Sequence, residues 1–291
     1  MALDLGPVGI WSRELRFHPD RGAIAAAAGE LEELGYSALF VPDIGGDVAG
    51  AVEHLLAATQ RVKVVTGILN IWLHPAYEVA GWRANVELQW PGRFGLGLGA
   101  SHKPVVEAIL PAAYNRPLSK MEEYLDQLDS AVPPVPRAGR LLAALGPRML
   151  ELARDRSAGA HPYLVSPDHT RLAREILGPK AVLAPEQAVV LEDDRAVALE
   201  RARAFVRDYL ALPNYVNNLR RSGFSDADLA HGGSDRLVDT VVVAGNEAMV
   251  AERVAAHRAA GADHVCVYVV GGAGDDLPLE AWRRLAPALL G

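Results

Sequence analysis

Short runs of β-type apolar residues alternate along this chain with longer runs rich in alanine and leucine. Apolar residues in the longer runs recur near the helical period, and Asp20 and Gly35 stand where one such helix would begin and end. Strands that are apolar on both faces and separated by helices form parallel sheets with right-handed crossovers. Eight such units predict an α/β fold, a (β/α)8 TIM barrel, over an open doubly wound sheet. The expected strands are 7–11, 38–42, 62–70, 94–99, 141–145, 160–165, 186–191 and 264–270.

Two stretches interrupt this alternation. Residues 103–119 follow the fourth strand and predict a long loop, and residues 212–245 predict an insertion between the seventh helix and the eighth strand. In a barrel both stretches emerge at the rim, where loops cover a substrate. No linker, repeat or low-complexity tract divides the chain, so we expect a single domain over residues 1–291.

The composition excludes several classes of partner. The net charge of −7 at pH 7 gives no basic face for nucleic acid or for an anionic membrane. No apolar run approaches the roughly 20 residues that span a bilayer, and the N-terminus lacks the pattern of a signal peptide. Cys266 is the single cysteine, which excludes an intrachain disulfide and is typical of a reducing compartment. We therefore expect a cytoplasmic protein that binds neither nucleic acid nor membrane.

The stretch FGLGLGASH, residues 94–102, has the spacing of a dinucleotide-binding loop. Gly95, Gly97 and Ala100 fit G-x-G-x-x-G/A, but a turn rather than a strand precedes them, and no ribose-binding carboxylate ends a later strand. Gly95, Gly97 and Gly99 instead alternate with leucines at the period of a strand. We expect the leucines to face helices and the glycines to leave open volume inside the barrel, where a flat ligand can approach.

Polar residues gather at the ends of the expected strands, where barrel enzymes place their chemistry. Several of these residues allow two interpretations. Asp43 is either a turn or helix-capping residue or a carboxylate that faces a cofactor, and Asn70 is either a turn residue or an amide that recognises a planar heterocycle. His74 is either a capping residue or a functional one, His102 is expected to face a ligand, and His161 is either a buried, hydrogen-bonded histidine or a functional one. The residues at these ends are Asp43, Asn70, Trp72, His74, Ser101, His102, Arg148, His161, Tyr163, Glu186 and Gln187.

Two further stretches carry chemical signals. In Leu145-Gly146-Pro147-Arg148 the glycine leaves room, the proline suits a first helical turn, and free N–H groups favour a phosphate, with Arg148 adding charge. A plain strand-to-helix turn is the alternative. Glu186 interrupts an apolar run, and a buried carboxylate needs a partner or a function.

The sequence gives no sign of a metal site. The nine histidines and one cysteine show no metal-ligand spacing such as C-x-x-C or H-E-x-x-H. There is also no G-x-S-x-G elbow and no P-loop, so hydrolase and kinase functions lack support.

Over nearly its whole length the chain resembles the luciferase-like oxidoreductases, and specifically their branch that depends on the deazaflavin coenzyme F420. The resemblance is carried by LEELGYSALFVPD (31–43), QRVKVVTGILNIW (60–72), LQWPGRFGLGLGASH (88–102), LAALGPRMLELARDRSAGAHPYLV (142–165) and AGADHVCVYVV (260–270). It implies a (β/α)8 barrel with a flavin-like cofactor at the C-terminal rim, and a homodimer.

The resemblance also implies a role for particular residues. Asp43 would face the deazaflavin ring, and a strand-three bulge, often with a non-prolyl cis peptide, would support the back of the ring. The residues implied at the ring are Asp43, Gly67, Ile68, Asn70, Gly99, Ser101 and His102, and those implied at the phosphate are Leu145, Gly146, Pro147 and His161.

One departure from the family pattern concerns the proton. Relatives that oxidise alcohols or sugar phosphates often carry histidine directly after the strand-two aspartate, where this chain has Ile44. His74 or His102 would then act in its place, beside Asp43, or the proton would come from water. We expect hydride transfer between F420 and a small organic substrate. The alternatives are an FMN-dependent monooxygenase on the same scaffold and a non-catalytic flavin-binding or deazaflavin-binding protein.

Overall fold

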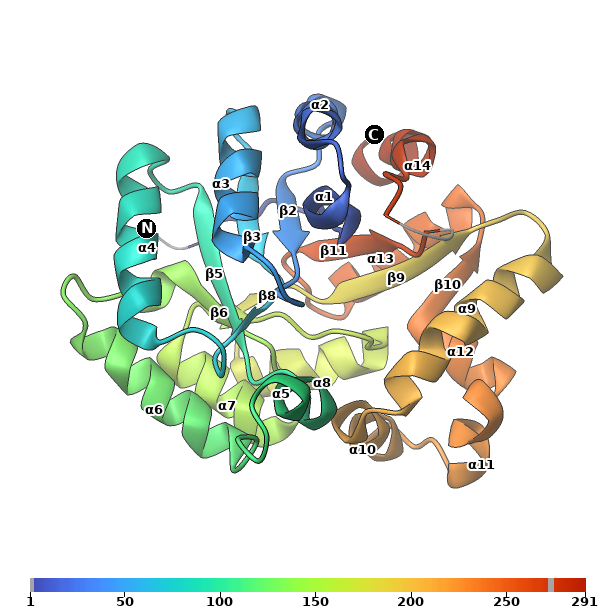
Figure 1. Ribbon diagram of the computed structural model, residues 1–291. Coiled ribbons are helices and arrows are strands. Elements are labelled where there is room, and N and C mark those ends of the chain that lie inside the picture. Colours follow the sequence, from blue (N-terminus) through green and yellow to red (C-terminus); the bar gives the residue numbers. More distant parts are fainter. Residues whose placement is uncertain (1–2, 272–274) are drawn as a thin grey trace.

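The structure is a computed structural model of the chain and describes residues 3–271 and 275–291 (Figure 1). Eleven parallel strands within these residues form one sheet. They are β1 (Val8–Trp11), β2 (Ala38–Val41), β3 (Lys63–Thr66), β4 (Leu69–Asn70), β5 (Phe94–Gly99), β6 (Arg140–Leu142), β7 (Gly159–Ala160), β8 (Val182–Leu183), β9 (Glu186–Leu191), β10 (Val242–Gly245) and β11 (Val265–Val269).

One segment of chain, residues 182–191, closes the hydrogen-bonded path, because it carries β8 at one end of the path and β9 next to the other end. The path runs β10-β9-β11-β1-β2-β3-β5-β6-β7-β8, with β4 beside β5, and only Ala184 and Pro185 separate β8 from β9. In this segment the Glu186 N–H donates to Pro162 O, while the Cys266 N–H donates to Pro185 O. One edge of the segment is thus bonded to the chain after β7 and the other to β11. The sheet curls round into the predicted (β/α)8 barrel.

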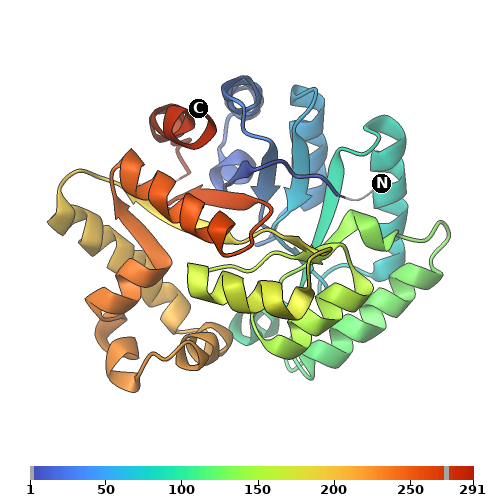
Figure 2. The same ribbon diagram turned by 180° about the vertical axis from the view of Figure 1, so that it is seen from behind.

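Helices surround this sheet, and α7, α8 and α13 lie side by side on the face seen in Figure 2. In α2 the Asp20 side chain accepts the N–H groups of Gly22 and Ala23, and Gly35 ends the helix with a φ of 100°, as expected. The helices are α1 (Glu14–Phe17), α2 (Arg21–Leu34), α3 (Val48–Ala58), α4 (Ala76–Gln89), α5 (Lys103–Ile109), α6 (Pro117–Ser130), α7 (Pro147–Arg156), α8 (Pro167–Leu177), α9 (Arg195–Leu210), α10 (Pro213–Arg221), α11 (Asp226–Leu229), α12 (Asp235–Val241), α13 (Glu247–Ala259) and α14 (Leu279–Leu290), with 3-10 turns at Arg137–Gly139 and Ala230–Gly232.

The structure corrects four expectations about the elements. The third strand, expected at 62–70, is broken into β3 and β4, and the sixth, expected at 160–165, ends at Ala160. The expected loop 103–119 contains α5, which is seven residues long. The insertion 212–245 contains α10 to α12 and ends in a strand that we did not expect, β10, which pairs with β9. Helical and strand signals are weak in segments this short, so they escaped detection.

The glycines of β5 do not face open volume, contrary to our expectation. A Cβ on Gly97 would lie 2.0 Å from the Thr66 carbonyl oxygen, and one on Gly99 would overlap the Ile68 side chain. The Gly97 N–H also donates to the Thr66 hydroxyl at 2.9 Å. The bare face of β5 therefore accommodates the irregular end of strand three, so any ligand would contact that segment rather than the glycines themselves.

Candidate active site

The end of β2 places a buried carboxylate at the centre of a hydrogen-bond network. Asp43 is 6% exposed, and its Oδ2 accepts the Asn70 N–H at 3.0 Å and faces His74 Nε2 at 2.8 Å. Its Oδ1 lies 3.7 Å from Arg16 Nη1, and Arg16 also donates to the carbonyls of Pro42 and Gly45. Asp47, not Asp43, caps the following helix α3. Asp43 thus joins α1, β4 and the loop before α4, and it orients His74, because the carboxylate accepts the His74 Nε2–H.

Strand three is interrupted at the predicted bulge, where the Gly67–Ile68 peptide is cis, as the resemblance implies. Trp11 Nε1 donates to Gly67 O at 2.8 Å, and Ile68 packs over Gly99. Asn70 is fully buried; its Oδ1 accepts the Trp72 N–H at 3.1 Å, while its Nδ2 has no partner among the described residues. A buried donor without a partner is costly unless a ligand accepts from it. The Asn70 amide therefore fits the acceptor atoms of a planar heterocycle.

The end of β5 carries the second candidate histidine. Ser101 adopts a left-handed φ of 53°, and the next residue, His102, has its Nδ1 2.9 Å from Asn214 Oδ1 in α10. With the amide oxygen as acceptor, Nδ1 carries the proton and Nε2 is left with a lone pair. Burial lowers the pKa of His102, and the bond to Asn214 opposes that shift only in part. His102 is therefore neutral at pH 7 and is suited to accept a proton. It lies on a different network from His74.

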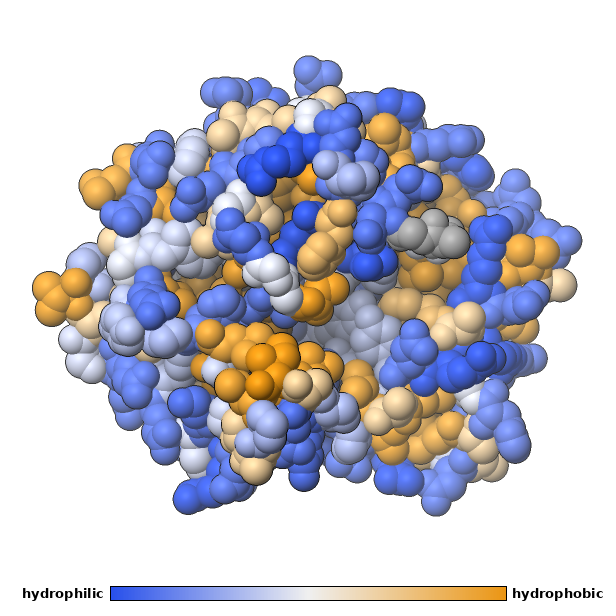
Figure 3. Space-filling view, viewed as in Figure 1, coloured by the Kyte–Doolittle hydropathy of each residue, from blue (hydrophilic) through white to orange (hydrophobic). Residues whose placement is uncertain are grey.

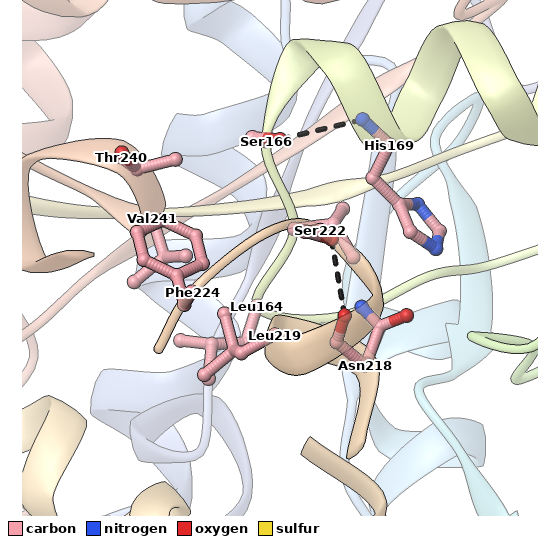
Figure 4. A pocket seen from close by; sticks show the side chains of 10 residues that line it. Leu164, Ser166, His169, Asn218, Leu219, Ser222, Phe224, Thr240 and Val241 are labelled. Carbon is pink, nitrogen blue, oxygen red and sulfur yellow. Dashed lines mark hydrogen bonds between the residues drawn. The ribbon is translucent and has the colours of Figure 1, made fainter. Parts of the chain in front are cut away.

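The predicted phosphate turn forms one wall of a cavity of about 240 Å³. Gly146 is the N-cap of α7 and Pro147 its first residue, as expected, and the starts of α7 and α8 meet here with the end of α10. Figure 4 shows the inner end of this region, where Ser166 and His169 of the α8 start face Asn218 and Ser222. A Cβ on Gly146 would lie 3.4 Å from Arg221 Nη2, so glycine keeps the approach to that cation open.

The cation at this cavity is not the one that we predicted. Arg148 is exposed and does not line the cavity, whereas Arg221 and Arg236 do. Arg236 is paired with Asp228, but no carboxylate pairs with Arg221 among the described residues, and its Nη2 donates to Asn218 Oδ1 at 3.2 Å. His169 donates from Nε2 to Leu145 O at 2.9 Å, which leaves its buried Nδ1 without a partner among the described residues. Asp168 also lines the cavity, but its carboxylate pairs with Arg171. Arg221 and the two helix N-termini therefore make the cavity suited to an anion.

His161 lies inside the barrel rather than at this cavity. It is 2% exposed, its Nδ1 donates to Ala184 O at 2.7 Å, and its ring is 4.8 Å from that of Phe40. Burial lowers its pKa to about 4, so the imidazole is neutral. This is the buried histidine of our alternative interpretation. We therefore leave His161 out of the proposed phosphate site.

An aromatic wall completes the mouth of the barrel, and most of it was missed in the sequence. Tyr163 packs against Trp11 at 5.5 Å between ring centroids, and its hydroxyl is 2.7 Å from that of Tyr209 in α9. Tyr268, at the end of β11, lies 4.6 Å from Trp11, and Tyr215 of α10 lies 5.2 Å from His102. Trp11 ends β1 and Tyr268 is the last residue but one of β11, and this position near a strand end is the signal that could have marked them. The surface in Figure 3 is hollowed near its centre, beside the apolar side chains over α5.

Within residues 3–271 and 275–291, no group of three or more His, Cys, Asp or Glu side chains is arranged to hold a metal ion. In the same part of the chain, no helix is long and apolar enough to cross a membrane.

Known proteins resemble this chain in both sequence and fold. A Mycobacterium tuberculosis protein assigned by name as a coenzyme F420-dependent oxidoreductase is 24% identical, over 87% of this chain and 91% of its own length. An F420-dependent secondary alcohol dehydrogenase, solved with an F420–acetone adduct, superposes with a TM-score of 0.76 at 14% identity over 98% of this chain and 99% of its own. The F420-dependent tetrahydromethanopterin reductase of Methanopyrus kandleri gives 0.76 at 15% identity over 99% of each chain.

A protein solved with FMN shares the same fold. The oxygenating constituent of the Pseudomonas putida 3,6-diketocamphane monooxygenase, solved with FMN, has a TM-score of 0.69 at 11% identity over 98% of this chain and 99% of its own. At these identities the superpositions show the barrel and not the reaction. A family model described as luciferase-like monooxygenase matches residues 12–264. Because that match covers most of the sequence, the chain belongs to the luciferase-like monooxygenase family.

Proposed function

We propose that this protein is a coenzyme F420-dependent oxidoreductase that transfers a hydride between F420 and a small organic substrate. The observation that carries the proposal is a site with two ends, one suited to a planar ring and the other to a phosphate. One end offers Asn70 Nδ2, which has no partner among the described residues, beside the bulge at Ile68. The other end is the cavity at Gly146 with Arg221, which no described carboxylate pairs. The 24% identical relative supports the choice of F420 over other cofactors.

The residues present fit a deazaflavin with a phosphate-bearing side chain. Asn70 would donate to a carbonyl or ring nitrogen, Ile68 would lie against a ring face, and the 145–147 turn with Arg221 would hold the phosphate. Bound F420 would supply two-electron hydride chemistry, which the protein directs by orientation and exclusion of water.

The candidate catalytic side chains divide into two pairs. Asp43 orients His74 through Nε2, and Asn214 orients His102 through Nδ1. In each pair a side-chain oxygen accepts a hydrogen bond from the imidazole N–H, and the other ring nitrogen keeps a lone pair. His74 and His102 are thus suited to take the proton of an alcohol when it is oxidised. Ile44, where many relatives have histidine, is 56% exposed and carries no such group.

An FMN-dependent monooxygenase is the second candidate, because a monooxygenase solved with FMN has the same fold. Titration of the purified chain with F420 and with FMN, followed by quenching of tryptophan fluorescence, separates the two. Micromolar or tighter binding of F420 with no binding of FMN is the expected result, and preference for FMN would overturn the proposal. Binding of F420 without turnover of any alcohol, aldehyde or enone in a broad panel would favour the non-catalytic alternative.

We also propose that the protein is a cytoplasmic homodimer. The single buried Cys266 supports a reducing compartment. Light scattering on the purified chain would give a mass of twice 31.1 kDa if the dimer forms, and the monomer mass would contradict it.

A further inference from the structure

The aromatic wall at the mouth of the barrel gathers a third of the aromatic residues of the chain. The chain has five tryptophans, eight tyrosines and five phenylalanines, which makes eighteen aromatic side chains. Phe205 of α9 extends the wall, because its ring centroid lies 4.8 Å from that of Tyr209 and 5.8 Å from that of Tyr268. The fold thus brings six rings from distant parts of the sequence to one place: Trp11, Tyr163, Phe205, Tyr209, Tyr215 and Tyr268.

The wall runs between the proposed ring site and one of the two candidate histidines. At one end Trp11 Nε1 donates to Gly67 O in the strand-three bulge at 2.8 Å. At the other end the ring of Tyr215 lies 5.2 Å from that of His102. Tyr163, Phe205 and Tyr209 between these ends are only half-buried, so part of each ring is open to a ligand. A substrate that lies between the bulge and His102 therefore contacts aromatic rings.

The wall itself carries no charge at neutral pH. Its only ionisable members are tyrosines, and burial raises the pKa of all four. A charged group of a substrate would find no counterion in this wall, and burial of an unpaired charge is costly. The wall therefore favours an uncharged substrate.

Glu186, the acid that interrupts an apolar run of the sequence, lies beneath the wall. It begins β9 and is fully buried opposite Cys266 of β11, two residues before Tyr268. Its Oε2 accepts the Leu164 N–H at 3.2 Å, and burial raises its pKa to about 8, so the carboxyl group is mostly protonated at pH 7. Gln187 points the other way and bonds His257 at 3.0 Å. The acid under the wall is therefore neutral as well.

The wall also offers a hydrogen-bond donor. The hydroxyls of Tyr163 and Tyr209 lie 2.7 Å apart. Together they carry two protons, and the bond between them uses one, so one proton is left for which the described residues offer no acceptor. The two hydroxyls also polarise each other, which strengthens the remaining donor. An oxygen atom of a substrate would accept this proton, whereas a hydrocarbon would not.

We infer that the substrate is an uncharged aromatic carbonyl compound or the corresponding alcohol, whose ring lies against the aromatic wall and whose oxygen accepts the free proton of the Tyr163–Tyr209 pair. The inference rests on the proposed function and adds the substrate class to it. Ring-to-ring contacts favour an aromatic ligand over an aliphatic one of equal area by up to about tenfold in affinity.

The reaction of such a substrate balances with groups already assigned to the site. When the alcohol is oxidised, its carbon loses a hydride to the cofactor, its oxygen loses a proton to His74 or His102, and the O–H electron pair becomes the second bond of the C=O group. Reduction follows the same steps in reverse, with the protonated imidazole as the acid. The tyrosine hydroxyl donates to the oxygen throughout, and this bond stabilises the negative charge that develops there.

The first test uses the full chain without cofactor and acetophenone with an isotopic label on its carbonyl carbon. Isotope-edited infrared difference spectra give the C=O band of the bound ketone, which a hydrogen bond moves to lower wavenumber. The band should move back to higher wavenumber in the double variant Tyr163→Phe and Tyr209→Phe, which keeps both rings. It should not move in Tyr215→Phe, which removes a hydroxyl outside the pair, or in Tyr77→Phe, whose hydroxyl bonds Glu78 on the surface of α4.

Three results of these spectra would overturn the inference. They are the absence of any bound ketone, a band that is the same in the wild type and the double variant, and a band that Tyr215→Phe moves as far as the double variant does. Thermal unfolding of each variant shows whether the chain is still folded, and the single variants Tyr163→Phe and Tyr209→Phe replace the double variant if it is not.

The second test follows oxidation of reduced F420 by acetophenone and by cyclohexyl methyl ketone, whose ring is neither planar nor aromatic. The ratio of the two kcat/KM values should fall about tenfold in Phe205→Leu, since the variant loses a ring of the wall while the intrinsic reactivity of each ketone stays the same. Tyr77→Leu is the control, because it removes a ring that is 72% exposed on α4, and its ratio should match that of the wild type.

The outcomes of this test separate the inference from the proposed function. A ratio that Phe205→Leu does not change, or a wild type that binds F420 and reduces other carbonyl compounds but not acetophenone, overturns the inference alone. A wild type that does not bind F420 overturns the proposed function, and the spectra of the cofactor-free chain then decide whether the wall binds an aromatic ketone.

Discussion

Asp43 has a structural role beside the functional one that we propose for it. Its carboxylate is paired with the Arg16 guanidinium, and both side chains are 2% exposed. Removing one partner of a buried ion pair leaves the other charge desolvated, which is far more costly than the pair is stabilising. The interpretations of Asp43 as a turn residue and as a cofactor-facing residue are therefore compatible, since the pairing with Arg16 holds the carboxylate that orients His74.

Asp43→Asn should lower the free energy of unfolding by about 3 kcal/mol, because Arg16 then stays buried without its anion. Urea denaturation followed by tryptophan fluorescence measures the change. Asp47→Asn is the control: Asp47 caps α3 in an exposed position, and asparagine caps a helix equally well. Equal stabilities for the two variants would contradict a structural role for the ion pair.

Gly97 allows a sharper test of why β5 is glycine-rich. Gly97→Ala places a Cβ against the Thr66 carbonyl, a backbone atom that cannot move aside cheaply, and should lower the free energy of unfolding by about 3 kcal/mol. Gly81→Ala is the matched control, because a Cβ in that position of α4 meets nothing within 4 Å and alanine favours the helix by about 1 kcal/mol. Thermal unfolding of the two variants should move in opposite directions, and tolerance of Gly97→Ala would mean that the strand-three bulge can shift.

At the scale of elements, α10 connects the two ends of the candidate site. Its first turn carries Asn214, which bonds His102, and its last residue is Arg221 at the anion cavity. Tyr215 and Leu219 bury the face between them. This helix lies in the insertion that we predicted at the rim, but its site residues could not be read from the sequence.

Arg221→Ala should weaken F420 binding about tenfold through loss of one charge-assisted contact to the phosphate. The affinity of the Arg221→Ala variant for the deazaflavin riboside, which lacks the phosphate, should equal that of the wild type. Arg220→Ala is the control on the same helix, because Arg220 pairs with Asp226 at the surface. Fluorescence titrations give the four dissociation constants, and an equal loss for both ligands would place Arg221 away from the phosphate.

The parts of the fold that the sequence predicted are those set by local periodicity. The barrel, the α2 caps and the start of α7 at Pro147 follow from residues close together in the chain. The partners of site residues do not. Asn214 lies 112 residues from His102, and Arg221 lies 75 residues after Gly146, so no spacing rule brings either pair together. His161 is a different case. The sequence left open whether it is a buried or a functional histidine, and the structure places it in the barrel interior.

At the scale of the whole molecule, buried histidines determine how stability depends on pH. Burial lowers the pKa of His161 and His264 to about 4 and that of His257 to about 3, against an ordinary value of 6.5. Between about pH 4.5 and 6.5 the unfolded chain therefore binds up to three protons that the folded protein does not. Glu186 acts in the opposite direction, because its pKa of about 8 keeps a proton on the folded protein that the unfolded chain has lost.

The unfolded chain thus binds about two more protons than the folded one in this window, so the free energy of unfolding should rise with pH, by about 3 kcal/mol per pH unit at its steepest. Urea denaturation at intervals from pH 4.5 to 6.5 measures the slope. His257→Gln should reduce it by about one proton, because glutamine does not titrate. Glu186→Gln should make it steeper by about one proton. A slope that Glu186→Gln does not change would mean that the acid is ionised in the folded barrel.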